Sequence, residues 1–105
     1  IAISHTKGLK IVEDSTIIHL EANGNCTTIY FDDGTRYLDT RTLKIYENIL
    51  DPTKFFRVHK SHIINLTRLV EYLNEDGHFA VLKGGLRIPV ARNRVTDFVK
   101  MLKQG

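Results

Sequence analysis

The chain has little of what several classes of protein depend on. It contains a single cysteine, Cys26, so no disulfide can form within it, which excludes a small disulfide scaffold and indicates a reducing compartment, the cytoplasm. No apolar run approaches the roughly 18 residues that a membrane-spanning helix needs. Two prolines and seven glycines are too few for a collagen-like chain. These absences leave an ordinary globular domain to be explained.

The composition fits that class. Hydrophobic residues make up 42% of the 105 residues and charged residues 26%, which is enough apolar material for one folded core. The length suits one domain. The chain opens on Ile1 without the basic and apolar segments of a secretory leader, so we expect residues 1–105 to be a single domain taken from a longer protein.

Charge is distributed unevenly along the chain, although the net charge is only +3. Residues 1–50 carry five Lys or Arg against seven Asp or Glu, whereas residues 51–105 carry ten against five. Two stretches, 54–68 and 83–94, each hold four basic residues and no acidic one. Because exposed basic side chains reach phosphate groups, this asymmetry points to a polyanionic partner such as a nucleic acid.

The first half of the sequence predicts short strands. Apolar and polar residues alternate over 18–22, the period-two pattern of a half-buried strand, and Asn23-Gly24-Asn25 ends that strand with a turn. The run 26–31 is β-branched and aromatic, and Asp33-Gly34 after it predicts a hairpin. The expected strands cover residues 1–5, 9–12, 18–22, 26–31 and 35–38.

A helix is expected in the middle of the chain. Thr40 or Thr42 would cap its start, and Asp51-Pro52 would end it. Its apolar stripe would consist of Leu43, Tyr46 and Leu50 together with Ile45 and Ile49.

The second half begins with a strand-like run at 55–58, and three more strands and a closing helix are expected after it. The polar cluster 59–62 interrupts that run, and the other strands cover residues 69–73, 78–82 and 86–90. The helix begins near Arg92, where Val95, Phe98, Val99 and Leu102 follow helical spacing. The predicted fold is mainly β, a β-rich α+β domain of antiparallel strands with one middle and one C-terminal helix. Its core would include Phe55, Phe56, Ile63, Ile64, Ile88, Val90 and Phe98.

The sequence offers no constellation for catalysis or for a metal. Cys26 lies in a strand-like run without a nucleophile motif, and Lys83-Gly84-Gly85 lacks the spacing of a phosphate loop. His59 and His62 are three residues apart, but Arg57 and Lys60 beside them would repel a cation. We therefore predict no enzyme activity, no cofactor and no metal site.

Three segments resemble the motifs of LytTR DNA-binding domains. The sequence Phe55-Phe56-Arg57-Val58-His59-Lys60-Ser61-His62-Ile63-Ile64-Asn65-Leu66 resembles the central motif of that family. Ile88-Pro89-Val90-Ala91-Arg92-Asn93 resembles the C-terminal motif, and Glu21-Ala22-Asn23-Gly24-Asn25 the N-terminal one. The three segments occur in the family's order, and the resemblance spans about residues 1–103.

The resemblance implies a fold and a function. The fold is an elongated stack of short antiparallel sheets, in which loops and turns, not a recognition helix, enter the major groove of double-stranded DNA. Such domains are usually the effector half of bacterial two-component response regulators, behind a receiver or other signalling domain. They regulate transcription by binding direct-repeat half-sites, so pairs of protomers on DNA are expected.

The resemblance also assigns residues to the DNA. Asn25, Lys60 and Arg92 are expected to contact bases, because an Asn amide pairs with adenine and an Arg fork pairs with guanine. An alternative for Asn25 is that it only holds its turn in a left-handed conformation. Contacts to the DNA backbone or secondary contacts are expected from Lys54, Arg57, His59, Ser61 and Arg94. The alternative for His59 is a hydrogen bond within its own turn.

Two other functions remain open from the residues alone. The chain could be a small β domain that binds single-stranded RNA or DNA, with Tyr30, Phe31 and Tyr37 as candidates for base stacking. It could also be a protein-interaction module that pairs through exposed strand edges. A preference for single strands over the duplex would favour the first of these functions. A complete lack of nucleic-acid binding would favour the second.

Overall fold

The computed structural model describes residues 1–104. Its strands and helices alternate with short turns, and strands dominate. The strands are β1 (Ala2–His5), β2 (Gly8–Ile11), β3 (Ile17–Asn23), β4 (Cys26–Phe31), β5 (Arg36–Asp39), β6 (Phe55–His59), β7 (His62–Asn65), β8 (Leu69–Asn74), β9 (His78–Leu82) and β10 (Arg87–Pro89). The helices are α1 (Leu43–Ile49) and α2 (Val95–Gln104), with 3₁₀ turns η1 (Asp14–Thr16), η2 (Leu66–Arg68) and η3 (Arg92–Arg94).

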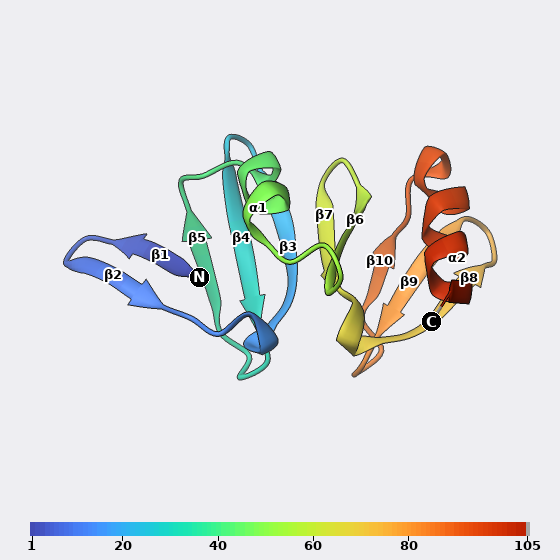
Figure 1. The fold of residues 1–105 in the computed structure, drawn as a ribbon, viewed down its shortest axis with the longest axis horizontal. Coiled ribbons are helices and arrows are strands. Elements are labelled where there is room, and N and C mark those ends of the chain that lie inside the picture. Colours follow the sequence, from blue (N-terminus) through green and yellow to red (C-terminus); the bar gives the residue numbers. More distant parts are fainter. Residues whose placement is uncertain (105) are drawn as a thin grey trace.

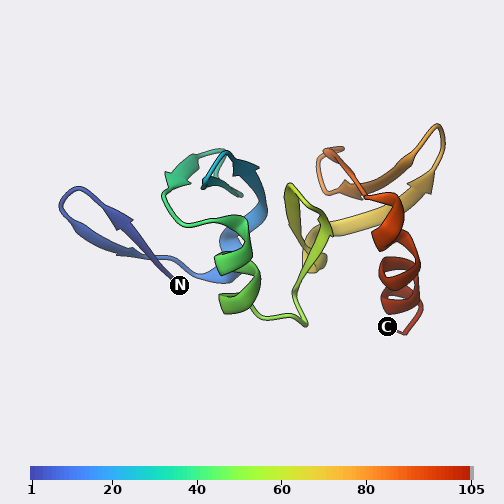
Figure 2. The same ribbon diagram turned by 90° about the horizontal axis from the view of Figure 1, so that it is seen from above.

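Three antiparallel sheets stand side by side along the long axis of the molecule, which measures 44 × 24 × 23 Å (Figures 1 and 2). The hairpin β1–β2 projects at one end, and a five-stranded sheet of order β5-β4-β3-β7-β6 forms the middle. A three-stranded sheet of order β10-β9-β8 lies at the other end, covered by α2. The elongated, mainly β fold with one middle and one C-terminal helix confirms the sequence prediction.

The central hairpin explains why β3 and β4 form where they do. In β3, Leu20 is buried and pairs with the buried Ile29 of β4, so the alternating apolar positions face one core. Asn23 pairs with Cys26 across a two-residue turn, and Gly24 takes a φ of 60° there. A turn with positive φ at its first central residue favours glycine, and its twist matches that of the strands.

Strand β7 was not predicted. The polar cluster 59–62 is a hairpin turn: His59 pairs with His62, so Lys60 and Ser61 alone form the tip. Behind the tip, Ile63 and Ile64 are both buried because β7 lies inside the sheet between β3 and β6 and faces a core on each side. A buried strand of four residues lacks the alternation that would have revealed it.

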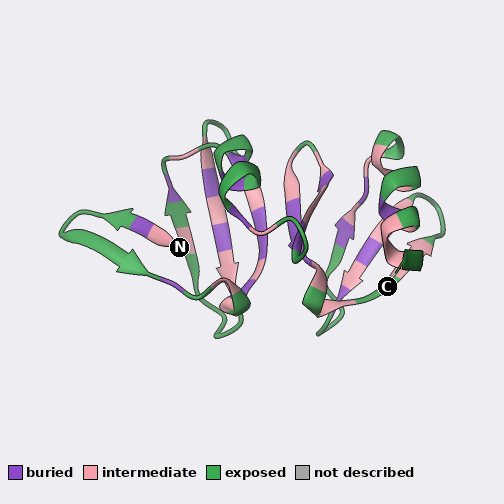
Figure 3. Cartoon of the chain, in the orientation of Figure 1, coloured by how far each residue is buried: buried purple, intermediate pink, exposed green. Residues whose placement is uncertain are grey.

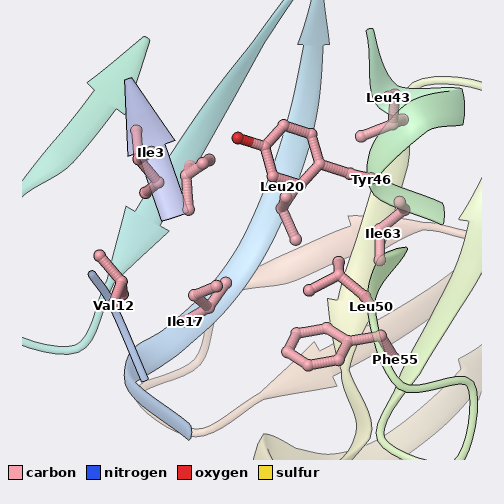
Figure 4. Close-up of a cluster of buried hydrophobic side chains, with 10 residues drawn as sticks. Ile3, Val12, Ile17, Leu20, Leu43, Tyr46, Leu50, Phe55 and Ile63 are labelled. Carbon is pink, nitrogen blue, oxygen red and sulfur yellow. The ribbon is translucent and has the colours of Figure 1, made fainter. Parts of the chain in front are cut away.

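Two separate hydrophobic cores hold the domain together (Figure 3). The first core lies between the five-stranded sheet and α1, and Figure 4 shows Leu20, Tyr46 and Ile63 packing together within it. The second lies between the three-stranded sheet, β6 and α2, around the fully buried Phe98. Of the predicted core residues, all are buried except Phe56, which is half-buried and packs against Phe98 with ring centroids 5.4 Å apart.

Helix α1 begins where predicted, but fewer of its apolar side chains are buried than predicted. Thr42 is its N-cap, and its hydroxyl accepts a hydrogen bond from the Ile45 N–H. Leu43 and Tyr46 are buried, but Ile45 and Ile49 are exposed, which corrects their assignment to the buried stripe. Because the helix has only seven residues, only one face of its two turns contacts the sheet.

A buried polar network joins α1 to β5 and β1. The Tyr46 hydroxyl donates to the Asp39 carboxylate and accepts from the Arg41 guanidinium at 2.9 Å. Arg41 also pairs with Asp39 at 2.7 Å and donates to the Ala2 carbonyl at 2.7 Å. Burial of Asp39 opposes its ionisation, but the hydrogen bonds from Tyr46 and Arg41 hold its pKa below the usual range.

Candidate nucleic-acid interface

The three segments that carry the predicted base contacts lie on one edge of the molecule. The turn between β3 and β4 (24–25), the turn between β6 and β7 (60–61) and η3 (92–94) all lie along the top in Figure 1. We call these three turns the upper edge. The turns between β4 and β5 (32–35) and between β9 and β10 (83–86) lie along the bottom and form the lower edge.

Backbone hydrogen bonds tie the three turns to one another. The Ala22 N–H, next to the first turn, donates to the Ser61 carbonyl at 2.9 Å. The Ala91 N–H, just before η3, donates to the Val58 carbonyl at 2.8 Å. The second turn is therefore anchored on both sides, and the three turns are held by rigid sheets instead of long loops.

Asn25 occupies the second position of its turn and is exposed. The positive φ of this turn belongs to Gly24, and Asn25 has none. The alternative that Asn25 holds the turn in a left-handed conformation is therefore wrong. Its side-chain amide has no hydrogen bond within the described residues, and it is available to a ligand.

Lys60 and Ser61 form the tip of the second turn. Lys60 is exposed, while its carbonyl accepts a hydrogen bond from the Arg57 guanidinium at 2.5 Å. The imidazole Nδ1 of His59 accepts from the Ser61 N–H at 3.0 Å, so His59 does hydrogen-bond within its own turn. That role fixes the tip and leaves the Lys60 ammonium facing solvent.

Arg92 is exposed in η3, the 3₁₀ turn that leads directly into α2. The Arg94 N–H donates to the Ala91 carbonyl at 2.8 Å, which closes this turn. Asn93 beside it is also exposed and lines a hollow together with Lys60. Asn93 belongs to the C-terminal motif and was not predicted to contact DNA, although its amide has the same pairing capacity as that of Asn25.

Arg57 and Arg94 stabilise the turns of this site through hydrogen bonds to backbone carbonyls. The Arg94 Nε donates to the Arg57 carbonyl at 3.0 Å, and its guanidinium lies 4.8 Å from the centre of the Phe56 ring. Arg57 pairs with Glu47 of α1 at 3.1 Å and donates to the carbonyls of the second turn. Both are partly exposed, so each can also present an N–H group towards a phosphate.

Other basic residues of the two acid-free stretches lie elsewhere. Lys54 precedes β6 and therefore lies at the opposite end of that strand from Lys60. Arg68 pairs with Asp32 of the lower edge at 2.9 Å, and the guanidinium of Arg87 lies 4.4 Å from the centre of the Phe79 ring. Each stretch is thus divided between two edges, because consecutive antiparallel strands return the chain to the opposite side.

Two imidazoles, the buried His19 and the half-buried His62, line a hollow together with Arg87 and Pro89 of β10. Burial lowers the pKa of His19 to about 4, the charge of nearby His62 lowers it further, and Glu21 opposes the shift. Burial also lowers the pKa of His62. His19 stacks on Tyr30 with ring centroids 4.3 Å apart. Both shifts favour the uncharged imidazole at neutral pH.

Residues 1–104 contain no group of three or more His, Cys, Asp or Glu side chains arranged to hold a metal ion. Among the same residues, no helix is both long and apolar enough to cross a membrane.

Comparison with known proteins gives one family. The profile of the LytTr DNA-binding domain matches residues 7–103. The transcriptional regulatory protein LytR of Staphylococcus aureus (strain N315) is 30% identical over 93 residues, which cover 86% of this chain and 37% of that protein. The heme-containing CO-sensing transcriptional regulator RcoM 2 of Paraburkholderia xenovorans (strain LB400) is 30% identical over 95 residues, covering 88% and 35%.

A solved structure has the same fold. The LytTr DNA-binding domain of a methyl-accepting/DNA response regulator from Bacillus cereus superposes with a TM-score of 0.82 at 23% identity, covering 97% of this chain and 94% of that one. The chain itself spans little more than a third of the length of the curated relatives that it matches.

Proposed function

This chain belongs to the LytTR family, the non-catalytic DNA-binding domains of transcription regulators, and from that premise we propose that it reads the sequence of double-stranded DNA with its upper edge. In this proposal the three turns enter the major groove, and no helix does. The observation that carries it is the placement of Asn25, Lys60 and Arg92, which are far apart in the sequence, on exposed turns of one edge.

Each of these three side chains suits a particular contact. The Arg92 fork can donate two parallel hydrogen bonds to O6 and N7 of guanine, and Lys60 can donate to the same acceptors. The Asn25 amide can both donate to N7 and accept from N6 of adenine. Arg57 and Arg94 beside them supply phosphate contacts, with His59 and Ser61 at the second turn as further donors. Lys54 would reach a phosphate only if the DNA extended past the end of β6.

Single-stranded nucleic acid is a poorer fit to this surface. Tyr30 is stacked on His19, and Phe31 packs against the first core. The Tyr37 hydroxyl donates to the Ser4 carbonyl at 2.7 Å. One face of Tyr30 is covered by His19, and Phe31 and Tyr37 pack against the first core, so these rings offer less free surface for stacking with unpaired bases.

We place the domain in the cytoplasm as the effector part of a longer, signal-responsive regulator, in keeping with its family and its unpaired Cys26. A receiver domain of a two-component system is the proposed input. Of the relatives named above, RcoM 2 is by its name a heme-containing CO sensor, whereas the name of LytR states no input, so the proposal concerns the output function first. On DNA, two protomers would occupy direct-repeat half-sites.

Selection of bound sequences from random duplex DNA tests the proposal. A recurring motif should emerge, and the same sequence as a single strand should compete poorly against the duplex. Arg92→Ala should then weaken binding to the selected duplex by about 1–3 kcal/mol and relax the preference at one base pair. Equal losses on selected and random duplexes would contradict a base-reading role for Arg92.

A further inference from the structure

We propose that two copies of this chain contact each other head to tail on DNA, with the β1–β2 hairpin of one copy against the β8–β9 hairpin of the next. The two hairpins are exposed, carry opposite charge and lie at opposite ends of the molecule. This inference rests on the proposed function, because the DNA is what brings the two copies into line.

The first hairpin is basic and apolar. Residues 1–12 contain His5, Lys7 and Lys10 and no acidic residue. Leu9 is 64% exposed and Ile11 is 76% exposed, the largest exposure among the large hydrophobic residues of the described chain. Both lie on the face of the hairpin opposite to the buried Ile3, which is why the domain's own core does not cover them.

The second hairpin is acidic. Residues 69–82 contain Glu71, Glu75 and Asp76 and no Lys or Arg. All three acidic residues are exposed, and Val70, which precedes Glu71 at the start of β8, is 60% exposed. The tip of this hairpin points away from α2 and its lysines (Figure 2). The acidic hairpin at one end is thus opposite in charge to the basic hairpin at the other, and each of them exposes apolar side chains.

The positions of the hairpins favour a tandem arrangement. They lie at the two ends of the 44 Å axis (Figure 1). A contact between different patches of identical chains repeats the same orientation from one copy to the next, whereas a two-fold dimer would reverse it. Copies in the same orientation are what direct-repeat half-sites require.

The contact is built to be weak without DNA. Strands β2 and β8 are free sheet edges, but Lys10 lies within β2 and a register shift at Val70 interrupts β8, two features that discourage open-ended strand pairing. Binding to neighbouring half-sites raises the effective concentration enough for such a contact to form.

Paired binding sites measure this contact separately from DNA binding itself. One duplex carries a single copy of the sequence selected from random DNA, and a second set carries two copies as direct repeats at stepped spacings. The wild-type chain should bind the two-copy duplex cooperatively at one spacing, by a factor on the order of ten. A two-copy duplex with inverted repeats should show no cooperativity.

Charge reversal at either end should remove the cooperativity and leave single-copy binding intact. The two variants are Lys7→Glu/Lys10→Glu and Glu71→Lys/Glu75→Lys; Asp76 is kept because its φ of 52° suits aspartate better than lysine. Unchanged affinity for the single-copy duplex shows that each variant is folded.

Mixing the two variants gives the sharpest result. In a tandem complex with one copy of each variant, the contact joins either two wild-type hairpins or two reversed ones, and both pairs are opposite in charge. Cooperativity should therefore return for these mixed complexes on the two-copy duplex. A chain carrying both reversals should also regain it. The control Lys83→Glu/Lys100→Glu makes the same charge change as the first variant outside both hairpins and should keep wild-type cooperativity.

Two outcomes would overturn the inference. Wild-type binding without cooperativity at every spacing, or cooperativity that both reversals leave intact, would refute the head-to-tail contact while DNA binding stands. If the wild-type chain bound no duplex at all, the proposed function would fail, and the inference that rests on it would fail too.

Discussion

At the scale of single residues, exposure separates the side chains that are free to reach a ligand from those that hold the turns of the site in place. Lys60 and Arg92 are exposed and free to reach a base, whereas Arg57 and Arg94 already bond to backbone carbonyls of the neighbouring turns. His19 is buried, and its lowered pKa keeps it uncharged near neutral pH.

The low pKa of His19 predicts a dependence of stability on pH. Because the unfolded chain binds a proton at about pH 6.5 and the folded chain only at about pH 4, the free energy of unfolding should fall as the pH decreases between these values. Urea unfolding should show a loss of roughly 1–3 kcal/mol over this range, smaller in His19→Phe. An NMR titration that placed the His19 pKa near 6.5 would contradict the assignment.

The two central residues of the first turn are expected to differ in role: Gly24 shapes the turn, and Asn25 is the proposed base contact. Since Gly24 supplies the positive φ, Gly24→Ala should destabilise the domain by about 1–2 kcal/mol in urea unfolding. Asn25→Ala should change stability by less than about 0.5 kcal/mol and still weaken binding to the selected duplex by about 1–3 kcal/mol. A loss of stability without a loss of discrimination in Asn25→Ala would return Asn25 to a structural role.

At the scale of elements, the network of Asp39, Arg41 and Tyr46 fixes how α1 sits on the sheet. It ties the end of β5 and the start of the chain to a helix too short to be stable alone. Glu47 on the same helix then reaches Arg57 behind the second turn. The placement of α1 therefore contributes to the order of the upper edge.

Removing one hydroxyl from this network should be costly. Tyr46→Phe leaves the buried Asp39 carboxylate without one of its donors, so we expect a loss of about 1–3 kcal/mol in urea unfolding at pH 7. Tyr37→Phe is the matched control, because its hydroxyl bonds an exposed carbonyl and should cost no more than about 1 kcal/mol. Equal losses of unfolding free energy in the two variants would show that the buried network contributes no more than one exposed hydrogen bond.

Elements with a local signal were predictable, and elements defined by their neighbours were not. The cap at Thr42 and the glycine turn at Gly24 are encoded in adjacent residues. Strand β7 escaped prediction because its character comes from two cores that flank it in space. The exposure of Ile45 and Ile49 depends likewise on how little of α1 the sheet covers.

At the scale of the whole molecule, topology decides which basic residues act together. The acid-free stretches 54–68 and 83–94 suggested two clusters of charge, but antiparallel strands send Lys60 and Arg92 to the upper edge and Lys83 and Arg87 towards the lower one. The sequence could not predict this division from spacing alone. The family motifs did identify the turns, because they mark positions in the fold and not positions along a charge profile.

The most direct test compares the two edges. The variants Lys60→Ala/Arg92→Ala and Lys83→Ala/Arg87→Ala each remove two exposed cations, so both change the net charge equally. Affinity for the selected duplex at constant salt should fall by about 2–6 kcal/mol in the upper-edge variant. The lower-edge variant should lose less than about threefold in affinity. Equal losses in the two variants, or a larger loss from the lower edge, would contradict recognition by the upper edge.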